Sequence, residues 1–514
     1  ASSVHLLVAC HGLWGQPIHL NYMMKKLAED KGGEISPLGV DPDKTTAAAT
    51  SSSSTSTATA SAQPQLVILM SKTNMDARTY DGVDWCAERT VQEIEREVRR
   101  LRKKGRKIVR FSILGYSLGG LMARYIVGLL YSRGWFKDVE PYSFTTLATP
   151  HIGMPMASGW FYRVAGVVGP RLLGRTGRQL YAKDKGWDTS DEGDDTPLLL
   201  AMTRPDSSFI KGLQLFKHLD IYASATSDTT VPVKTGGLMS VDPWKGWPEG
   251  GDEDVDGRGI TIERDPKYPA LVTAINIPSH RPKKPNPATR IYRAVVPRQL
   301  PFLLKPSALP FPFPLNWVYV LLAPVSIPLF FTLIIVRLAK GSQESDRRVK
   351  EIEAEWLKGD HAKAISSELE ADGYTKQHER SRIVAVLAEK LREADEDYVS
   401  VEGGTSLPNG ASHPAPSKDH KDAAGNVKRS ATSPLHFVIP SEESEAYLSS
   451  KQAPLSPIHQ EMQNNLHGNL PRMRKHLAFF EGVRNSHAII VCRTPSMPVH
   501  QMGKPVVQHF VDHF

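Results

Sequence analysis

Cysteine is scarce in this sequence. Only Cys10, Cys86 and Cys492 occur among 514 residues, and none of them forms a Cys-x-x-Cys pair. Neither a disulfide framework nor a structural zinc site is therefore expected. We interpret the three cysteines as small buried hydrophobic residues in a reducing compartment. We also find no internal repeat.

A strong excess of one charge is missing as well. Lys and Arg number 63 against 55 Asp and Glu, a net charge of +8. Basic residues cluster at Arg96–Arg110 and Arg337–Lys350, but no nucleic-acid motif accompanies them, so nucleic acid is not an expected partner. A surface that faces anionic lipid is the better explanation. No basic stretch precedes the apolar run Val4–Cys10, so a secretory signal is not expected.

The composition, with 40% hydrophobic and 23% charged residues, is that of a globular protein and excludes a wholly disordered, collagenous or coiled-coil chain. Short apolar runs alternate with stretches of helical periodicity, which predicts an α/β fold with a mostly parallel sheet. The expected strands are Val4–Cys10, Leu66–Met70, Lys107–Leu114, Tyr142–Leu147, Leu219–Ala225 and a late Ala488–Cys492. The expected helices are Asn21–Lys31, Glu88–Lys104, Leu118–Ser132, Ser342–Trp356 and Ser381–Asp397.

A long apolar segment interrupts this pattern. No charged residue occurs from Pro306 to Val336, and residues 315–336 reach the length of about 20 apolar residues that a membrane span requires. Pro324 and Pro328 lie inside the segment, so a re-entrant or hairpin insertion competes with a straight span. The basic residues that follow suit a cytosolic headgroup surface. The alternative is a buried core helix of a soluble enzyme.

The strongest local signal is a G-x-S-x-G motif at residues 115–119. An apolar strand precedes it and a helix follows it, as the strained turn of a nucleophilic serine requires. Small flanking residues at Gly115, Gly119 and Gly120 would leave the hydroxyl of Ser117 exposed. A serine in an ordinary glycine-rich turn is the alternative.

A nucleophilic serine also needs donors for the oxyanion that forms during the reaction. The N-terminus of the helix after Ser117 offers the Leu118 backbone N–H. The loop after the first strand is placed to supply a second donor. We expect the Leu13 backbone N–H in that role, with His11 and Gly12 shaping the loop. An ordinary turn at the end of a strand is the alternative.

An acid and a base must complete the site, in the chain order serine, acid, histidine. Asp228 follows an expected strand and is the best acid, against an Asx-turn aspartate that only caps its own loop. Asp220, at a strand start, is the weaker candidate. Among 18 histidines, His487 directly precedes a strand-like run and is the first choice of base. Its rivals are His476, His467, His509 and His513.

Several motifs together make a more specific resemblance. The chain resembles the fungal branch of the DUF676 serine esterases through VHLLVACHGLWG, TYDGVDWCAER, ILGYSLGGLMARY, FTTLATPHIG, SDTTVPV and NSHAIIVCR. These motifs cover residues 4–233 and 476–514. The family pattern implies that Ser117 is the nucleophile, Asp228 the acid and His487 the base. His151 lies before the acid and would shape the pocket. Trp85-Cys86-Ala87 departs from the glycine-containing stretch expected there.

The resemblance implies an α/β-hydrolase lipase; the branch includes a yeast lipid-droplet phospholipase. We expect acyl esters of glycerolipids as substrates, phospholipids above all, with no metal or cofactor. The expected location is intracellular, on a lipid droplet or the endoplasmic reticulum, with the catalytic domain in the cytosol. Protein partners stay unknown. The rivals are a soluble esterase or thioesterase, a lipid acyltransferase, and a non-catalytic membrane scaffold.

The separation between Asp228 and His487 predicts one interrupted hydrolase domain, because the two ends of the chain must meet. The expected parts are a hydrolase core at 1–300 with a disordered Ser/Thr/Ala loop at 45–62, a proline-rich apolar membrane segment at 301–340, a charged helical insertion at 341–400, a disordered linker at 401–435, and the rest of the core, with the histidine, at 436–514.

Overall fold

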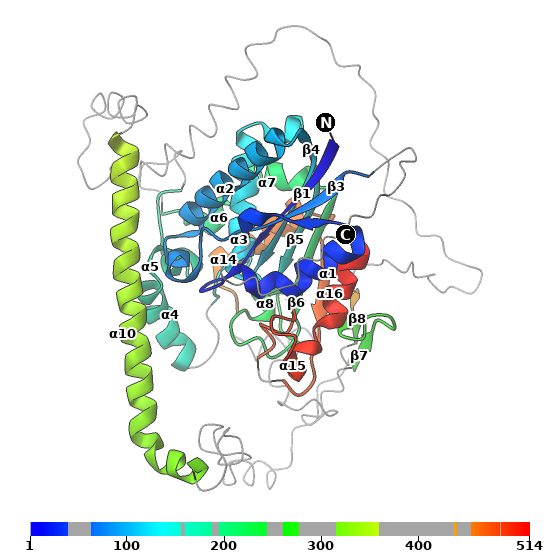
Figure 1. The fold of residues 1–514 in the computed structure, drawn as a ribbon. Coiled ribbons are helices and arrows are strands. Elements are labelled where there is room, and N and C mark those ends of the chain that lie inside the picture. Colours follow the sequence, from blue (N-terminus) through cyan, green and yellow to red (C-terminus); the bar gives the residue numbers. More distant parts are fainter. Residues whose placement is uncertain are drawn as a thin grey trace.

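A computed structural model describes residues 2–39, 63–155, 160–187, 195–243, 261–276, 315–358, 436–438, 454–483 and 485–514. These residues form a central twisted sheet with helices on both faces and one long helix along one side of the body (Figure 1). The predicted loop at 45–62, the predicted helix at 381–397 and the predicted linker at 401–435 lie outside the described residues.

The sheet contains every strand expected in the first half of the chain. Its strands follow the order β2 (Glu34–Ile35), β3 (Gln65–Met70), β1 (Ser2–Cys10), β4 (Arg106–Tyr116), β5 (Glu140–Leu147), β6 (His218–Ser224), β10 (Arg474–Ala478), β8 (Leu271–Asn276) and β7 (Thr261–Arg264), with β9 (His436–Val438) paired to β8. All pairs from β2 to β10 are parallel, whereas β8 pairs antiparallel with β10 and β7. The predicted, mostly parallel α/β sheet is confirmed.

Both faces of the sheet are buried, which explains the continuous apolar runs of its central strands. Along β1, Leu6 and Val8 contribute to one core, and Leu7 and Ala9 contribute to the other. The first core packs against α2 (Val83–Lys103), α3 (Leu118–Ser132), α7 (Ser208–Gln214) and α14 (Pro457–Asn469). The second packs against α1 (Asn21–Lys31) and α16 (Lys504–His513) (Figure 1).

The C-terminal part of the chain returns to the middle of this sheet. Strand β10 pairs in parallel with β6, with Arg474 opposite Asp220 and Ala478 opposite Ser224. The backbone N–H of Ala225 then donates to the carbonyl of Ala478 over 2.7 Å. The residues that follow β10 therefore emerge at the same sheet edge as the residues that follow β6.

The expected strand at Ala488–Cys492 is wrong. These residues form consecutive turns, and Ile489 to Cys492 are all buried beside α1 and α16. A short apolar run fits a buried turn as well as a buried strand, and nothing in its periodicity separates the two. Further helices that the sequence did not predict are α4 (Trp160–Leu172), α5 (Gly174–Leu180), α6 (Leu198–Ala201), α8 (Val233–Gly236) and α15 (Pro498–Gln501).

The apolar segment belongs to one continuous helix, α10 (Leu315–Lys358), which includes Pro324 and Pro328. The expected boundary at residue 340 falls inside this helix. By length and composition, α10 is apolar enough to cross a membrane, and only 6% of its apolar window is buried. It contacts the body through α4, α5 and the 3₁₀ turn η4 (Asp76–Tyr80). The alternative of a buried core helix is therefore wrong for the described part of α10.

Candidate active site

Ser117 lies between the end of β4 and the start of α3, on a sharp turn. Its backbone angles, φ 57° and ψ −126°, are unusual for a residue with a side chain and mark local strain. The surrounding glycines make this turn possible. A Cβ at Gly119 would lie 2.2 Å from the Cys10 carbonyl oxygen, and one at Gly120 would lie 2.0 Å from Thr149 Oγ1. A Cβ at Gly115 would meet Gly120 at 2.3 Å.

The structure brings Ser117 together with the predicted base and acid. His487 Nε2 lies 3.0 Å from Ser117 Oγ, and His487 Nδ1 lies 2.8 Å from Asp228 Oδ2. The Asp228 side chain is buried, with 2% of its surface exposed, and the His487 side chain retains 12%. A base within reach of the serine, oriented by an acid, is the arrangement that nucleophilic catalysis needs.

The acid is fixed by its own loop. Asp228 Oδ1 accepts the backbone N–H groups of Thr230 and Val231 over 2.9 and 2.7 Å. This is the Asx-turn that the sequence offers as the alternative to an acid role. Both descriptions hold at once, because Oδ1 caps the loop while Oδ2 faces His487.

Two residues that the sequence did not single out hold the histidine loop. Ser486 donates its backbone N–H to the Ser227 carbonyl and its hydroxyl to the Thr226 carbonyl, both over 2.9 Å. Tyr116 donates its hydroxyl to the His487 carbonyl over 3.0 Å. Burial raises the pKa of Tyr116, so its hydroxyl stays protonated and able to donate. Both residues stood inside quoted motifs, but no spacing rule pointed to their contacts.

The loop after β1 lies directly against the serine. A Cβ at Gly12 would lie 2.6 Å from Ser117 Cβ, so only glycine fits there. The chain turns at once, because the Gly15 N–H donates to the Gly12 carbonyl over 2.9 Å. Within the described residues, neither the Leu13 nor the Leu118 backbone N–H donates a hydrogen bond. These are the two groups that we expect to bind the oxyanion.

His11 lies under this loop. Its Nδ1 is 3.1 Å from the Gly12 carbonyl oxygen, and a Cβ at Gly15 would approach that Nδ1 to 2.5 Å. Burial lowers the pKa of His11, although its contact with the Gly12 carbonyl opposes this effect. His11 is therefore neutral near pH 7, and it fills the space beneath the loop.

The rival residues lie in other environments. His476 Nε2 is 2.8 Å from Asp220 Oδ1, and Arg474 also binds this carboxylate. His509 contacts the Tyr222 hydroxyl over 2.8 Å and stacks on His513, while His467 contacts Lys475. Asp220 and His476 thus form a second acid–histidine pair, but the serine contact goes to His487.

His151 does not contact the triad either. It is buried beside α3, where its Nε2 lies 3.0 Å from Thr146 Oγ1 and its carbonyl accepts from the buried Arg124. Burial lowers the pKa of His151 well below its usual value. Trp85, Cys86 and Ala87, the stretch that departs from the family pattern, lie in the first turns of α2. Within the described ranges, no group of three or more His, Cys, Asp or Glu side chains could hold a metal ion.

The parallel sheet, the strand–serine–helix turn and the serine–histidine–aspartate arrangement define an α/β-hydrolase fold. Comparison with known proteins narrows this class. Residues 47–241 match the family model described as "Putative serine esterase (DUF676)". The resemblance read from the motifs is thereby confirmed.

The curated relatives are fungal proteins. One "Putative lipase" of Saccharomyces cerevisiae is 30% identical over 135 residues, which cover 26% of this chain and 19% of that protein. "Putative lipase ROG1" of the same yeast is 28% identical, over 35% of this chain and 24% of its own length. A "Putative lipase" of Schizosaccharomyces pombe is 25% identical, over 34% and 22%. The chain thus matches about a fifth to a quarter of the length of these relatives.

Among solved structures, a putative cell surface hydrolase from Lactobacillus plantarum covers 46% of this chain and 75% of its own, with 15% identity and a TM-score of 0.24. A score this low carries no weight for the fold, which the sheet order and the site define.

Proposed function

We propose that this chain is a serine hydrolase that cleaves acyl esters of glycerolipids, with phospholipids as the expected substrates. The observation that carries the proposal is the pair of contacts that join Ser117 Oγ to His487 and His487 to Asp228. The fold adds a strained serine turn with the loop after β1 packed against it. Among the described residues, the Leu13 and Leu118 backbone N–H groups donate no hydrogen bond. The relatives named as lipases direct the choice of substrate toward lipids.

The proposed reaction proceeds through an acyl-enzyme. The His487 Nδ1–H donates to Asp228, which leaves Nε2 free to take the Ser117 hydroxyl proton as Oγ attacks the ester carbonyl. The Leu13 and Leu118 N–H groups bind the oxyanion of the tetrahedral intermediate. His487 returns the proton to the leaving alcohol as the ester C–O bond breaks. Water, deprotonated by His487, then attacks the acyl-enzyme. His487 returns this proton to Ser117 Oγ as the bond between the acyl carbon and Oγ breaks, which releases the fatty acid.

The N-terminal half of α10 supports a lipid surface as the place of reaction. Its large apolar side chains are exposed to water, led by Leu321 at 80% and Val325 at 70%. The other exposed apolar side chains of this half are Leu322, Leu329, Phe330, Leu333, Ile335 and Val336. An exposed apolar face of this kind marks a membrane or protein contact. Arg337 and Lys340 follow, and basic residues at this position suit anionic headgroups.

We therefore propose that α10 holds the active site at an intracellular membrane or lipid-droplet surface, with the catalytic domain in the cytosol. A continuous helix favours a span or a surface-lying helix over a hairpin. The interrupted hydrolase domain, with α10 in the insertion between acid and histidine, stays the proposed domain organisation.

The test is product analysis after the purified protein meets mixed phospholipid and triacylglycerol vesicles that carry labelled acyl chains. The proposal predicts labelled free fatty acid with wild type and none with Ser117→Ala. Label that appears on an acceptor lipid faster than as free acid would identify an acyltransferase instead. Turnover of short water-soluble esters alone would identify a soluble esterase. Equal turnover by wild type and Ser117→Ala would contradict the enzyme proposal and favour a scaffold.

A further inference from the structure

The loop that follows β1, residues 11–15, is held by the neighbouring turn η4. The Trp14 backbone N–H donates to Thr79 Oγ1 over 3.1 Å, and the Trp14 indole N–H donates to the Tyr80 hydroxyl over 2.7 Å. The Asp76 N–H donates to the Gly15 carbonyl over 3.2 Å. Trp14 itself has a positive φ of 50° and is half-exposed, so these contacts, rather than burial, define its position.

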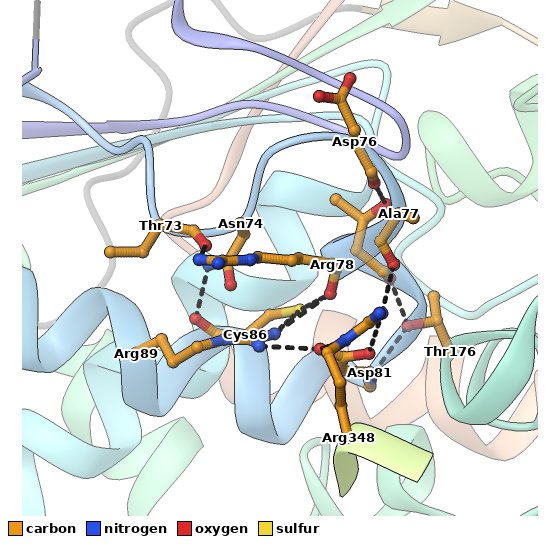
Figure 2. A network of polar contacts seen from close by, with 12 residues as sticks. Thr73, Asn74, Asp76, Ala77, Arg78, Asp81, Cys86, Arg89, Thr176 and Arg348 are labelled. Carbon is orange, nitrogen blue, oxygen red and sulfur yellow. Dashed lines mark hydrogen bonds and ion pairs between the residues drawn. The ribbon is translucent and has the colours of Figure 1, made fainter. Parts of the chain in front are cut away.

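The C-terminal half of α10, which contains Arg347 and Arg348, holds η4 in place. Asp81, which directly follows η4, is fully buried and accepts hydrogen bonds from two arginines (Figure 2). Arg89 of α2 binds one carboxylate oxygen over 2.7 Å, and Arg348 of α10 binds the other over 2.8 Å. Arg348 also donates to the Ala77 carbonyl over 3.0 Å, so one guanidinium joins α10 to both ends of the turn.

Close packing completes this connection. A Cβ at Gly341 of α10 would lie 2.7 Å from the ring of Tyr80, so the helix backbone lies directly on that ring. Thr176 of α5 donates its hydroxyl to the Thr79 carbonyl over 2.6 Å and accepts the Gly82 N–H over 3.0 Å. Tyr80 is thus held between α10 and Trp14.

Arg347 and Arg348 show that this contact is specific. The two residues are adjacent in α10, but Arg347 points outward, with 83% of its side chain exposed, and pairs with Glu351 one turn along the same helix. The Arg348 side chain is 29% exposed and binds a carboxylate that is buried completely. A buried carboxylate requires such charge-assisted partners, so Arg348 fixes the relation between α10 and η4.

We propose that Arg348, Asp81 and Tyr80 are positioning residues for the oxyanion donor of the loop after β1, and that they couple the docking of α10 to the rate of reaction at Ser117. The inference rests on the proposed serine hydrolase function. Neither Tyr80 nor Arg348 touches the reacting atoms. Tyr80 acts through Trp14, because its hydroxyl accepts the indole N–H while Thr79 accepts the backbone N–H. Arg348 acts through η4, the turn that carries Thr79 and Tyr80. The Leu13 N–H directly precedes Trp14 in the chain. The lipid-facing helix and the loop then form one rigid unit.

The physical consequence concerns kcat more than KM. An oxyanion donor acts on charge that develops only in the transition state, so its displacement lowers kcat while substrate binding stays close to normal. A misplacement of about 1 Å can cost on the order of a hundredfold in rate. We expect a loss of about tenfold or more when either Arg348 or Tyr80 loses its contact.

The test uses the full chain and a short-chain, water-soluble nitrophenyl ester, so that vesicle binding does not limit the rate. The variants are Arg348→Ala, Tyr80→Phe and their combination, with Arg347→Ala as the matched control. Tyr80→Phe removes a single oxygen and serves as the variant least able to disturb folding. Arg348→Ala leaves Asp81 its partner Arg89. Thermal unfolding of each variant is recorded beside kcat, KM and the rate of labelling by a fluorophosphonate.

The proposal predicts that kcat and the labelling rate both fall at least about tenfold in Arg348→Ala and Tyr80→Phe, with KM within about twofold of wild type. Arg347→Ala keeps wild-type values. The loss of kcat in the double variant is no greater than in the less active of the two single variants, because the two residues act along one route. Wild-type kcat in both single variants would overturn the coupling. A wild-type protein that neither hydrolyses the ester nor takes the label would instead contradict the proposed function, and the coupling with it.

Discussion

His487 Nδ1 lies 2.8 Å from Asp228 Oδ2, although 259 residues separate the two in the chain. Parallel pairing of β10 with β6 produces this contact, because both side chains follow the ends of neighbouring strands. Ser486 then fastens the histidine loop to the backbone of Thr226 and Ser227. The acid and the histidine thus meet at one sheet edge, beside the serine that follows β4.

The acid is tested by Asp228→Asn. Asparagine retains the shape of the side chain and an oxygen for the Thr230 and Val231 N–H groups, but it no longer stabilises the imidazolium that forms during the reaction. A loss of about 10⁴-fold in kcat is expected from the corresponding change in serine proteases. Asp220→Asn is the matched control, since Asp220 is also buried and bound to a histidine. Ester hydrolysis measured at pH 8 should remain within about twofold of wild type in the control. A similar loss in both variants would contradict the assignment.

The close approach of the loop after β1 is tested by Gly12→Ala. The added methyl group would lie 2.6 Å from Ser117 Cβ, so the loop or the serine must move. A displacement of about 1 Å predicts a loss of kcat of about a hundredfold. Gly468→Ala, in the last turn of α14, meets nothing within 4 Å and serves as the control. Steady-state kinetics on a soluble ester measures both. Unchanged kcat in Gly12→Ala would show that the loop does not take part.

The second acid–histidine pair makes a prediction about stability. Burial would raise the pKa of Asp220, but the hydrogen bonds from His476 and Arg474 outweigh burial and lower it. A carboxylate with a lowered folded pKa stabilises the protein above its unfolded pKa of about 3.9, and that stability is lost as pH falls through the folded pKa. Asp220→Asn should therefore lower the free energy of unfolding by about 1–3 kcal/mol at pH 7.

The pH dependence separates this effect from simple damage to packing. The difference in unfolding free energy between wild type and Asp220→Asn should narrow as pH falls from about 5 toward 3, because the wild-type carboxylate loses its charge. Urea titrations across this range measure it. A difference that is constant with pH would show that the ion pair is not its source.

Membrane binding by α10 is tested by a triple change of Leu321, Val325 and Leu329 to serine. The three side chains lie on one helix face at intervals of four and are 57–80% exposed, so folding in water should not depend on them. Each substitution removes about 1.5 kcal/mol or more of the free energy gained when the apolar side chain is buried in lipid. Flotation with anionic vesicles should show binding reduced by at least about a hundredfold.

Leu215→Ser is the control for that experiment. Leu215 is also exposed, at 47%, but it lies on the body after α7. Its change should leave vesicle binding and hydrolysis of a soluble ester unaltered. Undiminished binding in the triple variant would rule out the apolar face of α10 as the membrane contact.

Much of the fold could be predicted from the sequence, because its signals are local. The buried strand Val4–Cys10, the helix Asn21–Lys31 and the turn around Ser117 each combine an apolar run or an apolar periodicity with a glycine that follows or flanks it. No glycine of this kind bounds the run Ala488–Cys492, so its sequence does not distinguish a buried turn from a buried strand. The two prolines in α10 suggested a break, but the helix continues through both.

In the candidate site, too, the local features could be predicted from the sequence and the long-range contacts could not. The serine and its glycines obey a local pattern, whereas the prediction of His487 among 18 histidines depends on a family resemblance. The contacts of Tyr116, Ser486 and Arg348 follow from strand pairing and helix docking. They join residues that are 260 to 371 positions apart in the chain. No pattern in a single sequence indicates contacts between residues so far apart, and only the folded chain reveals them.

The central claim is that Ser117 is an activated nucleophile, and fluorophosphonate labelling followed by peptide mass spectrometry tests it most directly. The account predicts one labelled serine, Ser117, in the wild-type protein. Labelling should be absent in Ser117→Ala and should slow by at least about a hundredfold in His487→Ala, which removes the base. A wild-type protein without label, or label at another serine that persists in Ser117→Ala, would contradict it.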